Sequence, residues 1–296
     1  MTATTRWVRS LRAFSFPASL VPVAVAAATA NTSGEVVAWW TLVPFALAAL
    51  LFHAGTNVLN DYYDHVHGVD GEDDPDPTHA ISRGIVSPRF MLISGRLYFL
   101  LGVAIGGTIA VIRGPFFFLA GLAGASGAYF YTNARFSLKY RALGDVAVFL
   151  LMGPALVAMG DWALTGIVRP VAALHALPVG FVVTAILHGN NLRDISADAR
   201  AGVDTLAGRI GFHRGKSVYA LLLAAAYLSV VALVAAGVIP ILSTLSLLTA
   251  IPATRLVRRV VAAPDGAHLI DLPVRTAKLH LLFGVLYCLT SAGLVL

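Results

Sequence analysis

Apolar residues recur along the chain in stretches that approach the roughly 20 residues a membrane-spanning helix needs, and polar residues gather between them. We therefore predict an all-α integral membrane protein that forms a single transmembrane domain over residues 1–296. Its fold would be a bundle of about nine transmembrane helices. The expected helices cover residues 17–30, 36–58, 90–112, 115–131, 143–160, 170–189, 217–237, 239–254 and 277–296.

Composition excludes a soluble domain. Of the 296 residues, 58% are hydrophobic and 12% are charged, and the mean hydropathy is +0.80. A soluble domain of this length carries many more charged residues. The single cysteine, Cys288, excludes an intrachain disulfide and a metal cluster held by thiolates.

The distribution of Lys and Arg predicts the orientation in the membrane. With the N-terminus placed in the cytoplasm, all 21 basic residues except Arg113 and Arg169 fall in segments on the cytoplasmic side. Cytoplasmic loops carry such an excess of positive charge. The net charge of +6 is spread over several segments rather than one stripe, so we expect a lipid bilayer and no nucleic acid as partner. We expect the bilayer to be the plasma membrane of a bacterium.

Two acidic motifs, each led by asparagine, follow the second and sixth expected helices. The first lies in residues 57–70 and the second in residues 190–204, and both end in Gly-Val-Asp. In each motif an Asn stands four residues before an Asp, and a further Asp follows three or four residues later. Residues at this spacing share one face of a helix. We interpret the two motifs as halves of one site, built by an internal repeat.

The residue types of both motifs favour a divalent metal. Several carboxylates on one surface repel one another, and at a membrane boundary they need a cation or a water-filled cavity. Asp and Asn oxygens suit Mg²⁺, which keeps coordination positions for water and substrate phosphates. We therefore predict Mg²⁺ as cofactor and Asp61, Asp64, Asp194 and Asp198 as the catalytic carboxylates. The candidate metal ligands are Asn60, Asp61, Asp64, Asp70, Asp194 and Asp198.

Basic and aromatic residues near the motifs suit a prenyl diphosphate. Metal ions and basic groups neutralise the charge that grows on a departing pyrophosphate, and aromatic faces stabilise an allylic cation. The candidate substrate-binding residues are Asn57, Asn60, Asn190, Asn191, Arg193, Lys139, Arg141, Arg83, Tyr62 and Tyr131. Simpler alternatives stay open, because tyrosines at helix ends also anchor helices at the membrane interface. The acidic run at residues 72–76 could be a solvated loop, and His53 a buried packing residue.

Four segments resemble the UbiA superfamily of membrane prenyltransferases. They are LRAFSFPASLVPV (residues 11–23), NVLNDYYDHVHGVD (57–70), YTNARFSLKYRALGDVAVFLLMGP (131–154) and HGNNLRDISADARAGVDTLAGRIG (188–211). They look most like the naphthoate branch, which includes bacterial 1,4-dihydroxy-2-naphthoate prenyltransferases and the animal menaquinone-4 synthase. The resemblance implies a UbiA-type bundle of nine helices around a membrane cavity, with cytoplasmic Asp-rich loops that cap the diphosphate and Mg²⁺.

The family motifs carry over residue by residue. The resemblance places the first motif at Asn60, Asp61, Asp64 and Asp70, the second at Asn190, Asn191, Arg193, Asp194 and Asp198, and a basic loop position at Lys139. The last acid of the first motif stands six residues after Asp64, as in the naphthoate branch. The chain departs from many relatives after Gly202, where a basic residue is missing and either Arg200 or Arg209 would have to replace it.

The predicted function is Mg²⁺-dependent transfer of a polyprenyl group from an isoprenyl diphosphate to an aromatic acceptor, expected to be 1,4-dihydroxy-2-naphthoate, in menaquinone biosynthesis. For that acceptor the family chemistry implies loss of the carboxylate during ring alkylation. Hydroxybenzoate, homogentisate, a chlorophyllide and a glycerol phosphate lipid are alternative acceptors. A divalent-cation transporter is the alternative class, although transport carboxylates are expected near the membrane midplane rather than at helix ends. Prenyl chain length, oligomeric state and any general base stay open.

Overall fold

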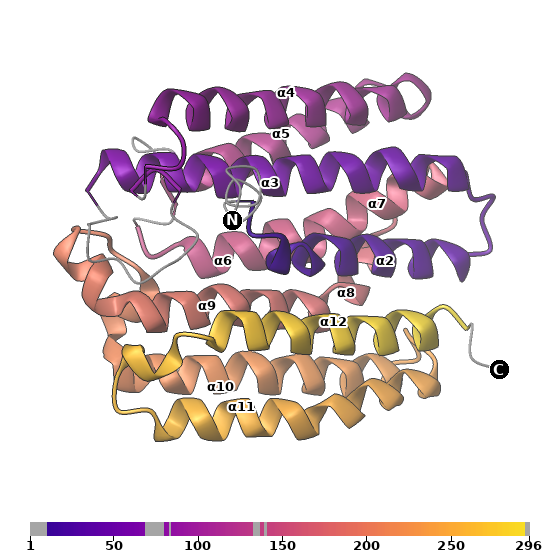
Figure 1. Cartoon of the computed structure of the whole chain (residues 1–296). Coiled ribbons are helices and arrows are strands. Elements are labelled where there is room, and N and C mark those ends of the chain that lie inside the picture. The colour runs from indigo at the N-terminus through magenta and orange to yellow at the C-terminus, as the bar shows by residue number, and fades with distance from the viewer. Residues whose placement is uncertain (1–10, 69–79, 83, 133–136, 139–140, 294–296) are drawn as a thin grey trace.

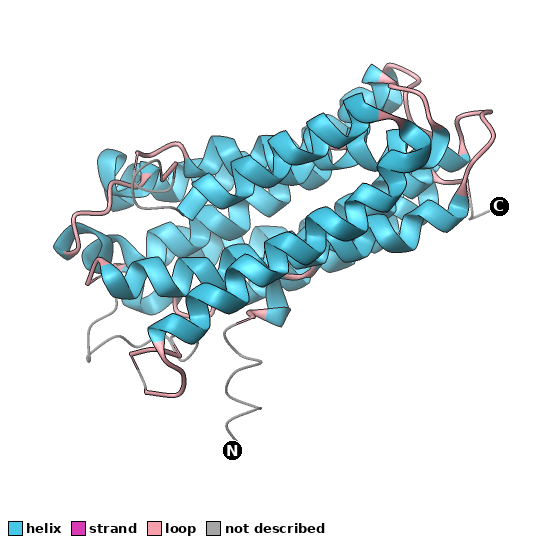
Figure 2. Ribbon diagram, turned by 90° about the horizontal axis from the view of Figure 1, so that it is seen from above, coloured by secondary structure: helices cyan, strands magenta, loops and turns pink. Residues whose placement is uncertain are grey.

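The computed structural model consists of helices joined by loops over the residues that it describes, which are 11–68, 80–82, 84–132, 137–138 and 141–293. Figure 2 shows long helices running alongside one another, which confirms the all-α fold class. The α-helices are α2 (Pro17–Asn31), α3 (Leu42–Val66), α4 (Pro88–Arg113), α5 (Pro115–Thr132), α6 (Gly144–Leu150), α7 (Leu156–Thr165), α8 (Pro170–His175), α9 (Leu177–Arg200), α10 (Leu206–Ala235), α11 (Ala250–Ala262) and α12 (Leu272–Ser291). Shorter helical segments are η1 (Ala13–Ser15), η2 (Trp39–Thr41), the π-helical η3 (Leu151–Ala155), η4 (Ile241–Thr249) and η5 (Gly266–Leu269).

Within the described residues, 6 helical stretches are long and apolar enough to cross a membrane. They are Ala13–Asn31, Trp39–Val66, Pro88–Arg113, Gly144–Thr165, Leu206–Ala235 and Gly266–Ser291. The expected count of nine is therefore not confirmed. Among the helices outside this set, α5 has 18 residues, α11 has only 13, and α9 carries the charged second motif. The stretches that do qualify indicate an integral membrane protein.

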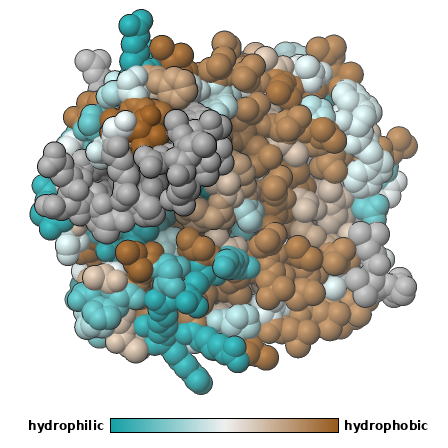
Figure 3. Space-filling view, viewed as in Figure 1, coloured by the Kyte–Doolittle hydropathy of each residue, from teal (hydrophilic) through white to brown (hydrophobic). Residues whose placement is uncertain are grey.

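Large apolar side chains face outward along the bundle, as contact with lipid hydrocarbon requires. Val43, Leu100, Leu221 and Leu228 are between 64% and 67% exposed. Apolar side chains cover most of the visible face in Figure 3, and hydrophilic ones gather in its left half, toward the end where α3 and α9 finish in Figure 1. The two acidic motifs thus lie at the polar end of the bundle.

The Asn and Asp residues that lead each motif lie inside helices rather than after them. α3 continues to Val66 and α9 to Arg200, past the ends expected at residues 58 and 189. Hydropathy marks the point at which a segment turns polar, but a helix continues beyond it when its polar face is buried against other helices. The Asn and Asp side chains of each motif therefore project from a regular helix, as their spacing predicts.

The helix expected over residues 143–160 is interrupted by a kink. At Gly153 the backbone leaves helical geometry (φ −112°, ψ −106°), and the next residue, Pro154, lacks a backbone donor. A Cβ atom on Gly153 would lie 3.0 Å from the Cα of Gly180 in α9, so glycine is needed where these two backbones meet. The residues around the kink that line the central cavity are Leu151, Met152 and Ala155.

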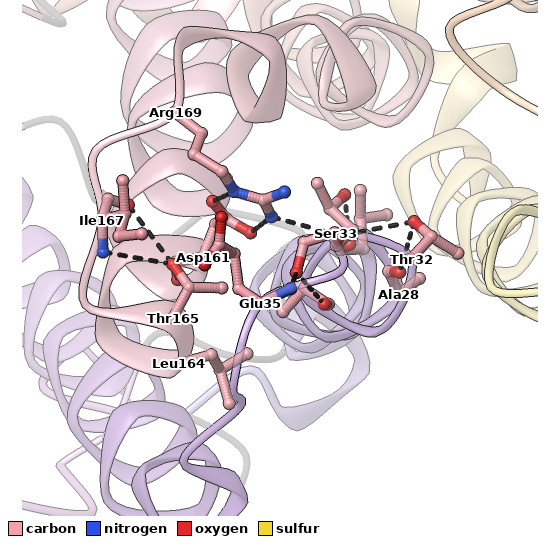
Figure 4. Close-up of polar contacts among 12 residues, drawn as sticks. Ala28, Thr32, Ser33, Glu35, Asp161, Leu164, Thr165, Ile167 and Arg169 are labelled. Carbon is pink, nitrogen blue, oxygen red and sulfur yellow. Dashed lines mark hydrogen bonds and ion pairs between the residues drawn. The ribbon is translucent and has the colours of Figure 1, made fainter.

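Two arginines at the opposite end of the bundle bind helix ends. Arg113 donates from Nε and Nη2 to carbonyl groups in the last turn of α7, both at 2.9 Å. Arg169 pairs with Asp161 (Figure 4). It also donates to the Thr29 carbonyl of α2 at 3.1 Å. The C-terminal carbonyl groups of a helix have no partner within it, so each guanidinium satisfies groups that would otherwise be left unbonded. These structural roles explain why both arginines depart from the distribution of the other basic residues.

Removing the Arg169 guanidinium is expected to destabilise the fold. The Asp161 side chain is 0% exposed and that of Arg169 is 16% exposed, so Arg169→Met leaves a buried carboxylate without its counter-charge. Breaking such a pair costs about 3–5 kcal/mol of unfolding free energy. A lower thermal unfolding temperature of the purified variant in detergent would register this loss. The double variant Asp161→Leu/Arg169→Met should recover most of it, and equal stability of the single variant and the wild type would contradict the prediction.

Candidate active site

The first motif forms a buried acidic site near the end of α3. Asp61 is 1% exposed and Asp64 is 3% exposed. Asn60 donates from Nδ2 to Asp64 Oδ2 at 2.6 Å, and the Ala80 amide donates to Asp61 Oδ2 at 3.1 Å. The hydroxyl of Thr132, the last residue of α5, donates to Asn60 Oδ1 at 3.4 Å. These bonds fix the direction of the side chains, because a buried carboxylate is stable only when polar partners replace its water.

The second motif contributes one buried carboxylate and one ion pair from α9. Asp198 is 6% exposed, whereas the Asp194 side chain is 37% exposed. Arg193 donates to both carboxylate oxygens of Asp194, from Nε at 2.6 Å and from Nη2 at 2.7 Å. The fork geometry of a guanidinium suits carboxylate and phosphate alike, so Arg193 stands where it can also bind an incoming anion.

Both motif helices end at the glycine of their Gly-Val-Asp segment. Gly68 (φ 68°) follows α3 and Gly202 (φ 69°) follows α9, each four residues after the last motif Asp within the helix. Glycine adopts this left-handed backbone without strain and commonly terminates helices in this way. Beyond Gly202, the Val203 amide returns to the Asp198 carbonyl at 2.8 Å. The two motifs therefore share their helix termination as well as their polar residues.

Tyr131, at the end of α5, connects the two motifs. Its phenol interacts electrostatically with three carboxylates, those of Asp64, Asp145 and Asp198. These come from α3, α6 and α9, and Tyr131 also lines the central cavity. Tyr131 thus lies within electrostatic range of carboxylates from both motifs.

A buried ion pair between Asp145 and His188 joins α6 to α9, and neither residue was among the predicted site residues. Asp145 Oδ2 lies 2.5 Å from His188 Nδ1, and Asp145 Oδ1 accepts a hydrogen bond from Asn191 Nδ2 at 3.3 Å. His188 Nε2 donates to the Gly215 carbonyl of α10 at 3.0 Å, because a carbonyl oxygen can only accept. The pair thus orients Asn191 of the second motif. An acidic residue at the start of an apolar membrane segment was the signal that could have identified Asp145.

The residues just before α6 are held against the end of the second motif. Arg141 and Asp204 form a backbone bridge, and the Ala142 amide donates to the Asp204 carbonyl at 2.6 Å. Ala142 adopts a left-handed backbone (φ 57°), which is uncommon for a residue with a side chain. Hydrogen bonds from Arg209 hold the pKa of the Asp204 carboxyl below its usual range. The Arg141 backbone therefore lies beside the end of the second motif, whereas the Arg209 side chain is engaged by Asp204.

The other candidates fall into three groups. Asn57 and Asn190 line the central cavity from α3 and α9. Tyr62 packs edge-on against Tyr63, with ring centroids 5.1 Å apart, and its contacts lie in the cluster around Met91 rather than along that cavity. The candidates that lie outside the described residues are Asp70, Arg83 and Lys139.

A cavity of about 760 Å³ extends from the motif end into the bundle. At the motif end its walls include Asn57, Tyr131 and Asn190, and farther in they are mostly apolar. The inner walls include Ile109, Phe117, Gly121, Gly124, Met159 and Trp162. From Tyr131 to Phe117 the cavity follows α5 for 14 residues, or about 21 Å of helix. Its shape and lining suit a long apolar chain with a polar head at the motif end.

The donor atoms at the motif end fit a magnesium ion. Among the described residues, no three His, Cys, Asp or Glu side chains are grouped closely enough to hold a metal ion by themselves. Mg²⁺ commonly uses one or two protein carboxylates and takes its other ligands from water and substrate phosphates. Asp61, Asp64 and Asp198 are buried oxygen donors at this end. This donor set suits Mg²⁺ and lacks the nitrogen and sulfur ligands that zinc prefers.

Comparison with known proteins identifies relatives over most of the chain. Residues 19–270 match the UbiA prenyltransferase family. UbiA prenyltransferase domain-containing protein 1 of Homo sapiens is 34% identical over 284 residues, which cover 95% of this chain and 81% of the human protein. The 1,4-dihydroxy-2-naphthoate octaprenyltransferase of Mycobacterium tuberculosis is 31% identical over 226 residues, covering 76% of this chain and 77% of that enzyme.

Solved structures share the fold at low sequence identity. A structure of digeranylgeranylglyceryl phosphate synthase superposes with a TM-score of 0.65 at 12% identity, covering 99% of this chain and 100% of that one. A UbiA homolog from Archaeoglobus fulgidus, bound to GPP and Mg²⁺, superposes with a TM-score of 0.59 at 17% identity, covering 95% and 99%. The helix arrangement described above is therefore that of these proteins.

Proposed function

Because this chain belongs to the UbiA prenyltransferase family, we propose that it transfers a polyprenyl group from an isoprenyl diphosphate to 1,4-dihydroxy-2-naphthoate, with Mg²⁺ as cofactor, in menaquinone biosynthesis. Family membership makes the chain a prenyltransferase. One observation carries the proposal for its substrate: the two acidic motifs and Tyr131 converge at the polar end of a deep apolar cavity. A diphosphate bound at that end would have its prenyl chain inside the cavity.

The motif side chains bind and orient the diphosphate in this proposal. Bound Mg²⁺ would supply positive charge against the pyrophosphate as it departs. The residues that would hold it are Asn60, Asp61, Asp64, Asp194 and Asp198, joined by Asp70 outside the described residues. Arg193 and Arg141 stand at the second motif and neutralise phosphate oxygens, as Lys139 and Arg83 would from outside the described residues. Asn190, which lines the cavity, and Asn191, which Asp145 positions, complete the polar end.

The cavity determines what happens to the prenyl group after the bond to the diphosphate breaks. Tyr131 stands at the junction of the polar and apolar parts, where its ring face can stabilise an allylic cation. The apolar walls exclude water, which would otherwise capture that cation. The acceptor ring is then the nucleophile within reach, and ring alkylation with loss of the carboxylate yields the prenylated product.

Two features support a naphthoate as acceptor. The M. tuberculosis relative named for 1,4-dihydroxy-2-naphthoate is 31% identical to this chain. The interval of six residues between Asp64 and Asp70 also resembles the naphthoate branch. Hydroxybenzoate, homogentisate, a chlorophyllide and a glycerol phosphate lipid are the alternatives that an activity assay must separate.

The assay is product formation by purified protein given geranylgeranyl diphosphate, Mg²⁺ and each acceptor in turn. We expect a prenylated naphthoquinol and pyrophosphate, with no product when EDTA replaces Mg²⁺. Product from another acceptor alone would replace the naphthoate. Absence of product with every acceptor and with donors of several chain lengths would contradict a catalytic role.

We also propose that the motif end faces the cytoplasm of a bacterium and that the two motifs descend from an internal repeat. The first proposal is supported by the basic residues near that end and by the structural roles of Arg113 and Arg169 at the other. The second is supported by the matching glycine terminations after α3 and α9. Cysteine labelling from either side of a sealed vesicle would test the orientation.

A further inference from the structure

A cluster of polar side chains lines the cavity on the wall formed by η1, α2 and α3. The members that border the cavity are Arg12, Ser15, Ser19, His53 and Asn57. Elsewhere the lining is mostly apolar, so these groups stand out against it.

Hydrogen bonds fix this cluster in one arrangement. Ser15 Oγ donates to the Arg12 carbonyl at 2.7 Å, so His53 Nε2 must donate to Ser15 Oγ across their 3.0 Å contact. His53 Nδ1 then accepts from Ser19 Oγ at 2.8 Å. The imidazole is neutral and uses both ring nitrogens. His53 therefore bridges the hydroxyl groups of Ser15 and Ser19. Ser19 Oγ retains lone pairs that can accept another hydrogen bond.

Arg12 is held at the edge of this cluster by an uncommon backbone. Its φ of 51° and ψ of 48° place it in the left-handed region, and its carbonyl accepts bonds from both the amide and the hydroxyl of Ser15. Asn57 donates to the neighbouring Leu11 carbonyl at 3.0 Å, which ties this segment to α3. A left-handed backbone in a residue with a side chain needs such support and often marks a functional position. The Arg12 guanidinium acts electrostatically on both His53 and Tyr131.

The cluster lies deeper in the bundle than the first-motif carboxylates. His53, Asn57 and Asp61 follow one another at four-residue steps along α3, which is about 6 Å for each step. The diphosphate is expected at Asp61 and beyond, so the groups around His53 lie about 6–12 Å farther into the cavity. An acceptor has to reach the first prenyl carbon from the side away from the leaving diphosphate. A position next to Arg12 and Ser19 meets that requirement.

We infer that Arg12 and Ser19 form the acceptor subsite, in which the Arg12 guanidinium binds the carboxylate of an aromatic acid and Ser19 Oγ accepts from its phenolic hydroxyl. This inference rests on the proposed function. A guanidinium is the side chain best suited to a carboxylate, and a water-poor cavity strengthens the contact. Because the carboxylate is lost in the reaction, the product can no longer form this contact with the Arg12 guanidinium. The subsite therefore favours binding of the acid and release of the uncharged quinol.

Substrate preference tests the subsite. The variants are Arg12→Gln, Arg12→Lys and, as a control that removes the same charge from an exposed position on α11, Arg255→Gln. Each purified enzyme is assayed with 1,4-dihydroxy-2-naphthoate and with 1,4-dihydroxynaphthalene, which lacks the carboxylate. Arg12→Gln should raise the KM for the naphthoate about tenfold or more and leave the KM for geranylgeranyl diphosphate within about twofold of wild type. Its preference for the acid over the carboxylate-free ring should disappear, whereas Arg12→Lys should keep part of it.

Other outcomes distinguish a failure of the proposed acceptor subsite from a failure of the proposed function. A raised KM for geranylgeranyl diphosphate with an unchanged acceptor preference would assign Arg12 to the diphosphate and overturn the subsite. Unchanged kinetics in Arg12→Gln would overturn it as well. Wild-type enzyme that prenylates no naphthoate would overturn the proposed acceptor itself. In that case equilibrium binding of hydroxybenzoate to wild type and Arg12→Gln decides the subsite, which requires weaker binding to the variant.

Discussion

Replacing Asp64 or Asp198 by Asn is expected to lower the rate of prenyl transfer by roughly 10²–10³-fold. Asn keeps the size and one oxygen of the carboxylate but removes the charge that would attract Mg²⁺. Asp64 and Asp198 come from different motifs and both interact with Tyr131, so each is expected to be needed. Both are buried, at 3% and 6% exposure, which leaves little room for water to compensate. Initial rates with geranylgeranyl diphosphate and saturating acceptor measure the loss.

The matched control is Asp265→Asn, which changes the same group at an exposed position bonded to His268 between α11 and α12. Its rate should equal that of wild type. Thermal unfolding of all three variants shows whether the fold survives. Folded Asp64→Asn or Asp198→Asn protein that retains more than about a third of the wild-type rate would contradict the assignment of these carboxylates to the reaction, because the expected loss is far larger.

Filling the cavity at Gly124 is expected to abolish transfer from long donors and spare the shortest one. Gly124 lines the cavity on α5, and a Cβ atom placed there meets no other atom within 4 Å. Gly124 lies seven residues before Tyr131, which is about 10 Å deeper into the bundle. In Gly124→Phe the ring would occupy the path of a long prenyl chain. A dimethylallyl group is short enough to end between the motif end of the cavity and this ring. We expect at least a hundredfold loss of kcat/KM with geranylgeranyl diphosphate, because the blocked chain loses its apolar burial.

Gly124→Ala is the control for this variant. Alanine adds one methyl group to open space and favours the helix by about 0.5–1 kcal/mol, so stability and activity should be retained. The ratio of rates with dimethylallyl and geranylgeranyl diphosphate is the readout, since a general folding defect would lower both rates together. Equal loss with both donors in folded protein, or no loss with either, would show that the prenyl chain does not pass Gly124.

Much of the fold could be predicted from local patterns of residues along the sequence. Apolar stretches predicted an all-α membrane protein, and four-residue steps predicted that Asp61 and Asp64 share a helix, as they do in α3. The repeat of Asn and Asp also predicts that the two motifs form one site, and Asp64 and Asp198 both act electrostatically on Tyr131. These features depend on helix periodicity and hydropathy, which neighbouring residues determine.

Features that depend on packing between distant segments could not be predicted. The Asp145–His188 pair joins residues 43 positions apart, and only the crossing of α6 and α9 brings them together. Helix ends were misplaced where a buried polar face continues, as in α9. The left-handed backbone of Arg12 has no signal in its residue type, because arginine rarely adopts it. The roles proposed for the site residues remain predictions.

The most direct test is an experimental structure of the protein with Mg²⁺ and the slowly reacting analogue geranylgeranyl thiolodiphosphate. We expect the diphosphate to lie between the Asp61–Asp64 and Asp194–Asp198 segments, with the prenyl chain running past Tyr131 and Gly124 toward Trp162. A diphosphate bound away from both motifs, or a prenyl chain on the lipid-facing surface with the cavity empty, would contradict it.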